Sequence, residues 1–156
     1  MSRVQAHGTA IKVGETGLVF IGPPGAGKSS LALQTLFSAR MAGHFAALVS
    51  DDQLFLEAVD GGVRAVGPAS IAGMIELGGS GIGRVASIPD AMIHHAIRLV
   101  ETHAGNRIPE ENQYWRADGG IVLPMLFLDR LVRDPYPWLE ALIDGFPLRP
   151  FVPDGA

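Results

Sequence analysis

Short apolar runs separated by glycine-rich turns dominate the hydrophobic pattern of the chain. Runs of this length, bounded by turn residues, are typical of buried β-strands rather than of helices. The pattern predicts strands over 8–13, 17–21, 45–49, 54–59, 63–66, 74–77 and 120–128. The run 94–101 could be strand or helix, and its β-branched residues favour a strand. The glycine-rich turns at 14–17 and 60–62 should each close a β-hairpin.

Only two segments favour helix. One begins at Ser29 and the other covers 137–143, whereas the polar segment 106–120 predicts a loop. The strand at 120–128 contains Pro124, which requires a sheet edge or a bulge because proline has no N–H. Hairpins combined with one strand–loop–helix step predict an α/β fold with a mixed sheet.

The length of 156 residues suits a single domain, which we expect over 1–145, followed by a loose, proline-containing tail over 146–156. A net charge of −4 gives no electrostatic case for binding nucleic acid. The absence of cysteine excludes disulfides and thiolate metal sites, and it fits a reducing cytoplasm. The start does not resemble a signal peptide and no apolar run is long enough to span a membrane, so we expect a soluble cytoplasmic protein. The apolar composition also suggests contact with another subunit.

A phosphate-binding pattern follows the strand at 17–21. Its residues are Gly22, Pro23, Pro24, Gly25, Ala26, Gly27, Lys28 and Ser29, with Ser30 next in the chain. Glycines let backbone N–H groups converge on phosphate oxygens, Lys28 adds a charge for the outer phosphates, and the Ser29 hydroxyl suits Mg²⁺. A strand before the loop and a helix after it favour a nucleotide site over a glycine-rich turn that binds nothing.

A pair of acids, Asp51 and Asp52, directly follows the strand at 45–49. Ligands of open α/β sheets gather at the carboxyl ends of the strands. Paired acids there could hold Mg²⁺, or one could accept a proton from an attacking hydroxyl. An exposed turn or a helix cap is the structural alternative.

Another candidate acid, Glu76, lies in the apolar run 74–77, which opens a second glycine-rich run at 78–83. We expect a carboxylate in this apolar run to be buried and to have a metal or a basic partner, because an unpaired buried charge is costly.

Three histidines and one arginine are weaker candidates. His7 precedes the first predicted strand, and a histidine there is more often structural. Arg107 lies in the polar segment and could contact phosphate, although solvation is usual for an arginine. His94 and His95 are adjacent and are expected to be structural or on the surface.

Together these segments resemble one family. His7-Gly8, the loop 22–29, the run 49–52 and the run 75–82 occur in the order and spacing of the catalytic domain of bacterial HPr kinase/phosphorylase. The run 75–82 is more specific to this family than the phosphate loop is. The resemblance implies a core like that of phosphoenolpyruvate carboxykinase: a mixed sheet with a phosphate loop and flanking helices.

The resemblance also implies an activity. Members of this family use ATP and Mg²⁺ to phosphorylate a serine of HPr, a small phosphocarrier protein of the sugar phosphotransferase system. They reverse the reaction by attack of inorganic phosphate on phosphoserine. The family further implies a homo-oligomer, specifically a hexamer.

Specific roles follow from the same resemblance. Asp51 would accept the serine proton and return it in the reverse reaction, and Asp52 would support Asp51 or the metal. Ser29 and Glu76 would lie on Mg²⁺.

Phosphate would be held in part by His7 and Arg107, although the match at Arg107 rests on 106–109 alone. The family usually has an arginine at the position of Gly78 and an acid at that of Ser30. We expect the chain to resemble the short form found in proteobacteria, which lacks the N-terminal regulatory domain.

Two other functions stay open. A phosphate-loop kinase for a small metabolite would not need the second glycine-rich run. A nucleotide-binding regulatory protein without catalysis is favoured by Gly78 and Ser30, and disfavoured by the intact Lys28 and Asp51.

Overall fold

The central strands carry apolar side chains on both faces. In β3 (Thr16–Ile21), Leu18 and Phe20 pack into one hydrophobic cluster, and Val19 and Ile21 pack into another. Because side chains alternate along a strand, a sheet built from such strands needs cover on both sides. Two different layers supply it.

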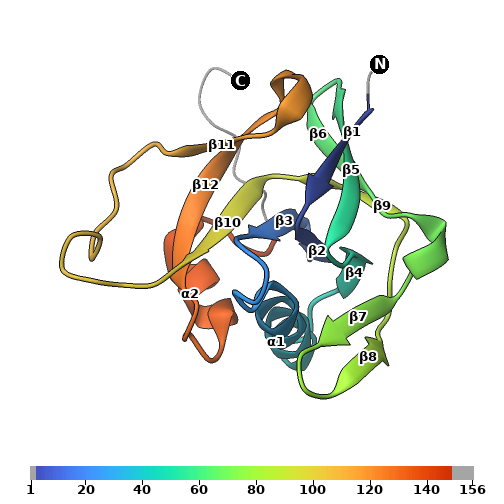
Figure 1. The fold of residues 1–156 in the computed structure, drawn as a ribbon, viewed down its shortest axis with the longest axis horizontal. Helices are drawn as coiled ribbons and strands as arrows, with labels where there is room; N and C mark the ends of the chain where they lie inside the picture. The colour runs from blue at the N-terminus through green and yellow to red at the C-terminus, as the bar shows by residue number, and fades with distance from the viewer. Residues whose placement is uncertain (1–2, 149–156) are drawn as a thin grey trace.

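The computed structural model describes residues 3–148, and its central layer is a six-stranded sheet (Figure 1). The strands lie in the order β11 (Tyr114–Arg116), β12 (Val122–Asp129), β10 (His95–Val100), β3, β2 (Thr9–Val13) and β4 (Ala46–Ser50). β10 runs parallel to β3 and β12, whereas β2 is antiparallel to β3 and β4. The predicted mixed sheet is confirmed. The carboxyl ends of β4, β3, β10 and β12 meet at one edge.

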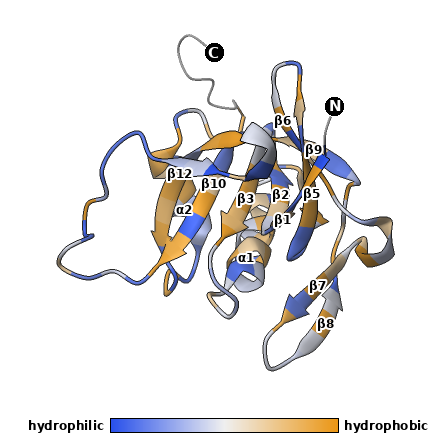
Figure 2. Ribbon diagram, turned by 45° about the horizontal axis from the view of Figure 1, so that its top comes forward, coloured by the Kyte–Doolittle hydropathy of each residue, from blue (hydrophilic) through white to orange (hydrophobic). Residues whose placement is uncertain are grey.

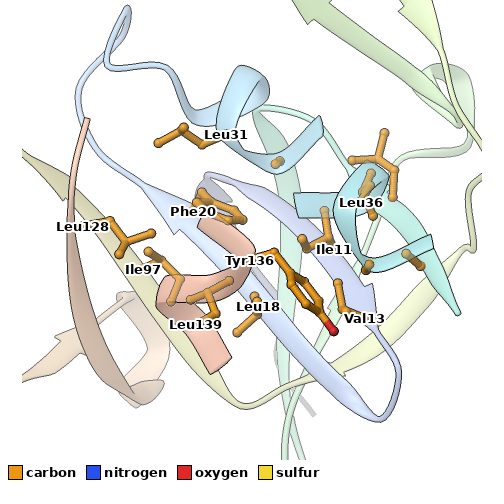
Figure 3. Close-up of a cluster of buried hydrophobic side chains, with 14 of the residues drawn as sticks. Ile11, Val13, Leu18, Phe20, Leu31, Leu36, Ile97, Leu128, Tyr136 and Leu139 are labelled. Carbon is orange, nitrogen blue, oxygen red and sulfur yellow. The ribbon is translucent and has the colours of Figure 1, made fainter. Parts of the chain in front are cut away.

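Two helices cover one face of this sheet. They are α1 (Lys28–Met41) and α2 (Pro135–Leu142). Figure 3 shows Leu31 and Leu36 of α1 and Leu139 of α2 gathered around Phe20 and other strand residues. Asp134 caps α2 by accepting a hydrogen bond from the Tyr136 N–H at 3.2 Å.

A four-stranded antiparallel sheet covers the other face. Its order is β1 (Arg3–His7), β5 (Gln53–Val59), β6 (Gly62–Val66) and β9 (Asp90–Ile93). Leu54, Leu56 and Ala65 of this sheet pack against Val19 and Ile21 of the central one. The hairpin predicted around 60–62 joins β5 to β6.

The second glycine-rich run is the turn of a separate hairpin, formed by β7 (Met74–Leu77) and β8 (Gly81–Arg84). A short 3₁₀ turn at Ala69–Ile71 precedes it, and the hairpin lies beside α1 in Figure 1. Buried Ile75 attaches the hairpin to the helix side of the core.

Four short strands were not expected: β1, β8, β9 and β11. The segment predicted as a loop, 106–120, contains β11 and the 3₁₀ turn Asp118–Gly120. The connection before β11 is largely hydrophilic in Figure 2, as its composition predicts. β1 exposes alternate polar residues, and its Arg3 forms an ion pair with Glu57 of β5.

Pro124 lies in an internal strand, so the predicted edge position is wrong. It pairs with Tyr114 of β11, and the ladder with β10 begins one residue later, at Ala96 and Met125. The Met125 N–H donates to the Gln113 carbonyl, so the missing N–H of Pro124 points to the opposite side, ahead of that ladder. The missing N–H of Pro124 therefore interrupts the hydrogen bonding of β12 with neither β10 nor β11.

The packed part of the chain extends beyond the predicted boundary at 145. Phe146 is 7% exposed and belongs to the core under the helices. The Glu15 N–H donates to the Pro147 carbonyl at 2.8 Å. The rest of the predicted tail, 149–156, lies outside the described residues. Within 3–148, neither helix is both long and apolar enough to cross a membrane.

Candidate functional site

The phosphate loop connects β3 to α1 at the edge where the strand ends meet. Gly25 and Gly27 have φ of 78° and 99°, in the left-handed region that favours glycine. An added Cβ at either position would meet no atom within 4 Å, so backbone conformation rather than crowding requires glycine. Gly27 directly precedes α1, whose free N–H groups and dipole favour an anion.

Lys28 is buried at the start of α1 and turns back over the loop. Its Nζ donates to the Gly22 carbonyl at 2.9 Å. An ammonium has three donors and this bond uses one. The side chain is therefore held where the outer phosphates of a nucleotide would lie.

Asp51 is the centre of a hydrogen-bond network beneath the loop. Its Oδ1 accepts from the Ser29 hydroxyl at 2.6 Å and from the Thr9 hydroxyl at 2.8 Å. Its Oδ2 accepts from the backbone N–H of Glu76 at 2.7 Å. The residue is 7% exposed. One carboxylate thus fixes α1, β2 and the β7–β8 hairpin relative to one another.

Asp52 has the opposite environment. It is exposed and adopts φ of 68°, a conformation that aspartate tolerates better than most residues. Its carbonyl accepts from the Gly8 N–H at 3.0 Å, which holds the turn between β4 and β5 against the start of β2. The bent backbone brings Asp52 to the cleft beside the phosphate loop, whereas Asp51 lies beneath it.

This cleft has a volume of about 450 Å³. Its walls combine the phosphate loop with both acid-bearing segments. The lining residues are Pro24, Gly25, Ala26, Gly27, Lys28, Ser29, Ser30, Asp52, Glu76 and Gly78. The structure therefore brings together most of the residues that the sequence singled out.

Glu76 is exposed on the cleft wall, so the prediction that it is a buried carboxylate is wrong. Ile75 takes the buried position of β7, and the alternation of the strand turns Glu76 outward. No basic partner is needed at this exposure.

The residues fit a Mg²⁺ ion that is shared with nucleotide phosphates. The Ser29 hydroxyl donates its hydrogen bond to Asp51, which leaves the lone pairs of the Ser29 oxygen free for a cation. Within residues 3–148, no three His, Cys, Asp or Glu side chains converge as a metal cage. Mg²⁺ rarely uses one, since it keeps waters and phosphate oxygens as ligands beside one or two protein groups.

Two predicted residues do not line the cleft. His7 is exposed at the end of β1, opposite Gln53, and borders a neighbouring hollow of about 140 Å³. Arg107 is exposed in the connection between β10 and β11. Lys28 is the one basic residue among those that line the cleft in the described part of the chain.

His94 and His95, expected to be structural or on the surface, do not line the cleft. The Nδ1 of His94 accepts from the Gly17 N–H at 2.9 Å, which joins the end of β9 to β3. His95 is buried at the start of β10. Burial lowers the pKa of His95 to about 4, and the neighbouring His94 adds to that shift.

Sequence reasoning missed Thr9. The available signal is a threonine within an apolar strand, because a hydroxyl that becomes buried needs a partner. In the structure Thr9 is 0% exposed. Sequence reasoning also missed Glu101 and Arg130, which form an ion pair of 2.9 Å beside the phosphate loop. Their positions depend on how β10 and β12 pair, which no local pattern reveals.

Comparison with known proteins adds independent information. No family model matches the chain. A stretch of 76 residues, 49% of this chain, is 36% identical to an HPr kinase/phosphorylase from Clostridium novyi (strain NT). The structure of the Hpr(Ser) kinase/phosphatase from Coxiella burnetii superposes with a TM-score of 0.68 at 23% identity, and the match covers 89% of this chain and 93% of that chain. The resemblance to the HPr kinase/phosphorylase family is confirmed.

The fold is that of the Coxiella burnetii protein: a mixed α/β sheet with few helices. The aligned stretch covers only 23% of the length of the Clostridium novyi relative. The similarity to that relative is therefore limited to about a quarter of its length.

Proposed function

We propose that the chain is an ATP- and Mg²⁺-dependent serine kinase that acts on HPr and that also catalyses phosphorolysis of the phosphoserine product. The hydrogen bond from Ser29 to Asp51 carries this proposal, because it joins the loop to the acid-bearing strand end beneath one cleft. That arrangement presents a hydroxyl oxygen to a metal and leaves a second acid, Asp52, facing the cleft. The family resemblance supplies the substrate.

We assign a separate role in the reaction to each group of residues around the cleft. The loop N–H groups and Lys28 bind the phosphates, and Ser29 with Glu76 holds Mg²⁺. Bound Mg²⁺ would neutralise charge on the phosphate oxygens. In the forward direction the serine oxygen bonds to the γ-phosphorus, the bond from that phosphorus to the β,γ-bridging oxygen breaks, and the serine proton goes to a carboxylate.

Asp52 is the better placed of the two acids to take that proton. Asp51 already accepts three hydrogen bonds and is buried, which suits an orienting role. Asp52 is exposed to the cleft where a protein serine must arrive. We therefore assign the base to Asp52 and the positioning of Ser29 to Asp51, in exchange for the roles that the resemblance implied.

The reverse reaction uses the same groups. An oxygen of inorganic phosphate bonds to the phosphoserine phosphorus, the bond to the serine oxygen breaks, and Asp52 returns the proton to that oxygen. Pyrophosphate is the second product. His7 is proposed to assist on the substrate side, because the chain after β1 is bonded to the Asp52 backbone. For Arg107, contact with phosphate remains a prediction from the resemblance.

The deciding experiment is incubation with labelled ATP, Mg²⁺ and HPr from the same cell, with phosphoserine as the readout. We expect label on one serine of HPr, and none with Lys28→Ala. Addition of inorganic phosphate should then remove the label as pyrophosphate. Absence of phosphoserine with an active preparation that binds ATP would contradict the proposal.

A regulatory nucleotide-binding protein is the second candidate, and Gly78 favours it. The family usually places an arginine there, whereas Gly78 leaves open space at the tip of the hairpin, with no atom within 4 Å of an added Cβ. ATP binding without transfer to HPr would support this reading. Gly78→Arg would then test whether the missing charge is the reason.

We further propose that the protein works in the cytoplasm as a homo-oligomer, a hexamer by family resemblance. Three large apolar side chains, Phe37, Met41 and Phe45, are more than half exposed near the end of α1. Light scattering at micromolar concentration should give a molar mass several times the 16.5 kDa of one chain. A molar mass of 16.5 kDa would contradict oligomerisation.

A further inference from the structure

The phosphate loop separates two hollows rather than bordering one. The cleft with Asp52 and Glu76 lies on one flank. A second hollow of about 290 Å³ lies on the other flank, and both share Pro24, Gly25 and Ala26. The second hollow is otherwise lined by Pro23, Leu99, Val100, Glu101 and Arg130.

The two flanks differ in chemistry. The first carries two serine hydroxyls, the Lys28 ammonium and two carboxylates, which suit phosphate, a metal and a reacting hydroxyl. The second offers proline rings and the end of β10, and above them an ion pair between Arg130 Nη2 and Glu101 Oε1 at 2.9 Å. Apolar walls with a few fixed polar groups are typical of small-molecule sites.

This ion pair is held in place by the sheet. Val100 of β10 pairs with Asp129 of β12, so Glu101 and Arg130 follow adjacent strand ends (Figure 1). The Arg130 N–H donates to the Val100 carbonyl at 2.9 Å, and the Asp129 carboxylate accepts from the Thr102 N–H at 3.1 Å. The hydrogen bond from Thr102, together with one from Leu131, lowers the pKa of Asp129. The two connections are thus tied together without a ligand.

We propose that this second hollow is the nucleoside subsite, with Arg130 and Glu101 as its binding residues. A nucleoside triphosphate lying along the loop has its reacting end at Asp52, so its other end must leave on the opposite flank. There the planar guanidinium of Arg130 can stack on the base. The Glu101 carboxylate can accept hydrogen bonds from the ribose hydroxyls, as acids do in other nucleotide sites.

This assignment rests on the proposed function, because it requires that the loop bind a nucleotide. The test compares ATP with inorganic tripolyphosphate, which has the phosphates without the nucleoside, by calorimetry in Mg²⁺. The variants are Arg130→Ala and Glu101→Gln. Arg133→Ala and Glu110→Gln are the matched controls, since both residues are exposed and neither lines this hollow.

We expect the wild-type protein to bind ATP more tightly than tripolyphosphate. Arg130→Ala should weaken ATP by about tenfold and leave tripolyphosphate within about twofold. Glu101→Gln should act in the same direction, and the controls should change neither ligand.

Equal weakening of both ligands by Arg130→Ala would overturn the assignment, because Arg130 would then bind phosphate. Unchanged ATP affinity in both variants, or equal wild-type affinity for ATP and tripolyphosphate, would overturn it as well. A wild-type protein that binds neither ligand would instead refute nucleotide binding itself, and the subsite with it.

Discussion

The Ser29 hydroxyl donates a 2.6 Å hydrogen bond to Asp51 Oδ1, from the first turn of α1 to the residue that follows β4. A hydroxyl has a single proton, so this bond fixes which way its lone pairs face. The same oxygen of Asp51 also accepts from Thr9. Asp51 therefore acts on the cleft through Ser29 rather than by facing the cleft itself.

Asp51→Asn should weaken the response to Mg²⁺ while the chain still folds. The amide nitrogen would have to donate to the Ser29 and Thr9 hydroxyls, because the Glu76 N–H needs the remaining oxygen. Donation to Ser29 uses a lone pair that the metal needs. We expect the affinity for ATP to fall by about tenfold or more in Mg²⁺ and to change little in EDTA, as calorimetry can measure.

Thr9→Val is the matched control for Asp51→Asn. It removes a hydroxyl that donates to the same carboxylate oxygen but leaves Ser29 in place. It should cost about 1–3 kcal/mol of unfolding free energy without changing the Mg²⁺ dependence of ATP binding. An equal loss of Mg²⁺ response in both variants would mean that network rigidity, rather than the Ser29 lone pairs, is responsible.

Asp52→Asn should abolish most catalysis and leave nucleotide binding intact. General base catalysis contributes roughly 10²–10⁴-fold, and one group would serve both directions of the proton transfer. Asparagine also tolerates the φ of 68°, so the turn should persist, whereas Asp52→Ala would add strain. The kinase and phosphorolysis rates should fall together, with ATP affinity within about twofold of wild type.

If Asp51→Asn lowered both rates by such a factor without affecting ATP–Mg²⁺ binding, and Asp52→Asn did not, the roles of the two acids would be reversed. That outcome would restore the assignment implied by family resemblance. The pair of variants therefore separates a proton acceptor from a positioning residue.

Local features of the site could be predicted from the sequence. The phosphate loop and the two hairpin turns depend on glycine positions within a few residues, which the chain displays directly. The location of Asp51 and Asp52 followed from one strand and the rule that ligands gather at strand ends.

Non-local features could not be predicted. The different environments of Asp51 and Asp52 depend on Thr9 and Glu76, whose positions are set by sheet pairing and by the separate hairpin. Alternation along β7 buries Ile75 and exposes Glu76, but the apolar run alone suggested burial of the acid. Short polar strands such as β1 gain their stability from a partner strand, so their own sequence gives little signal.

Folding stability should fall as the pH drops below the ordinary pKa of histidine. Burial lowers the pKa of His95 to about 4, from 6.5 in the unfolded chain. Between these values the unfolded state binds more protons, so acid favours unfolding, and the effect levels off below both. The His94 pKa is lowered as well, chiefly by burial and also by the charge of Lys12.

Urea unfolding can measure this dependence. For His95 we expect a loss of about 2 kcal/mol between about pH 7.5 and about pH 5. His95→Gln should reduce the slope, whereas His103→Gln, in an exposed connection, should retain it. An unchanged slope in His95→Gln would show that other groups dominate the acid response.

Glu76→Gln separates the side chain of Glu76 from its backbone. The substitution keeps the shape of the residue and the N–H that donates to Asp51 Oδ2, so the network beneath the cleft should persist. Only the charge facing the cleft is lost. If the carboxylate holds Mg²⁺, the Mg²⁺ concentration for half-maximal activity should rise by about tenfold or more, with little change in ATP binding in EDTA. Glu140→Gln removes an exposed carboxylate from α2 and should leave the Mg²⁺ titration unchanged. If the Mg²⁺ titration of Glu76→Gln matched that of the wild type, Glu76 would only line the cleft and would not bind the metal. Mg²⁺ binding would then depend on Ser29 and the phosphates.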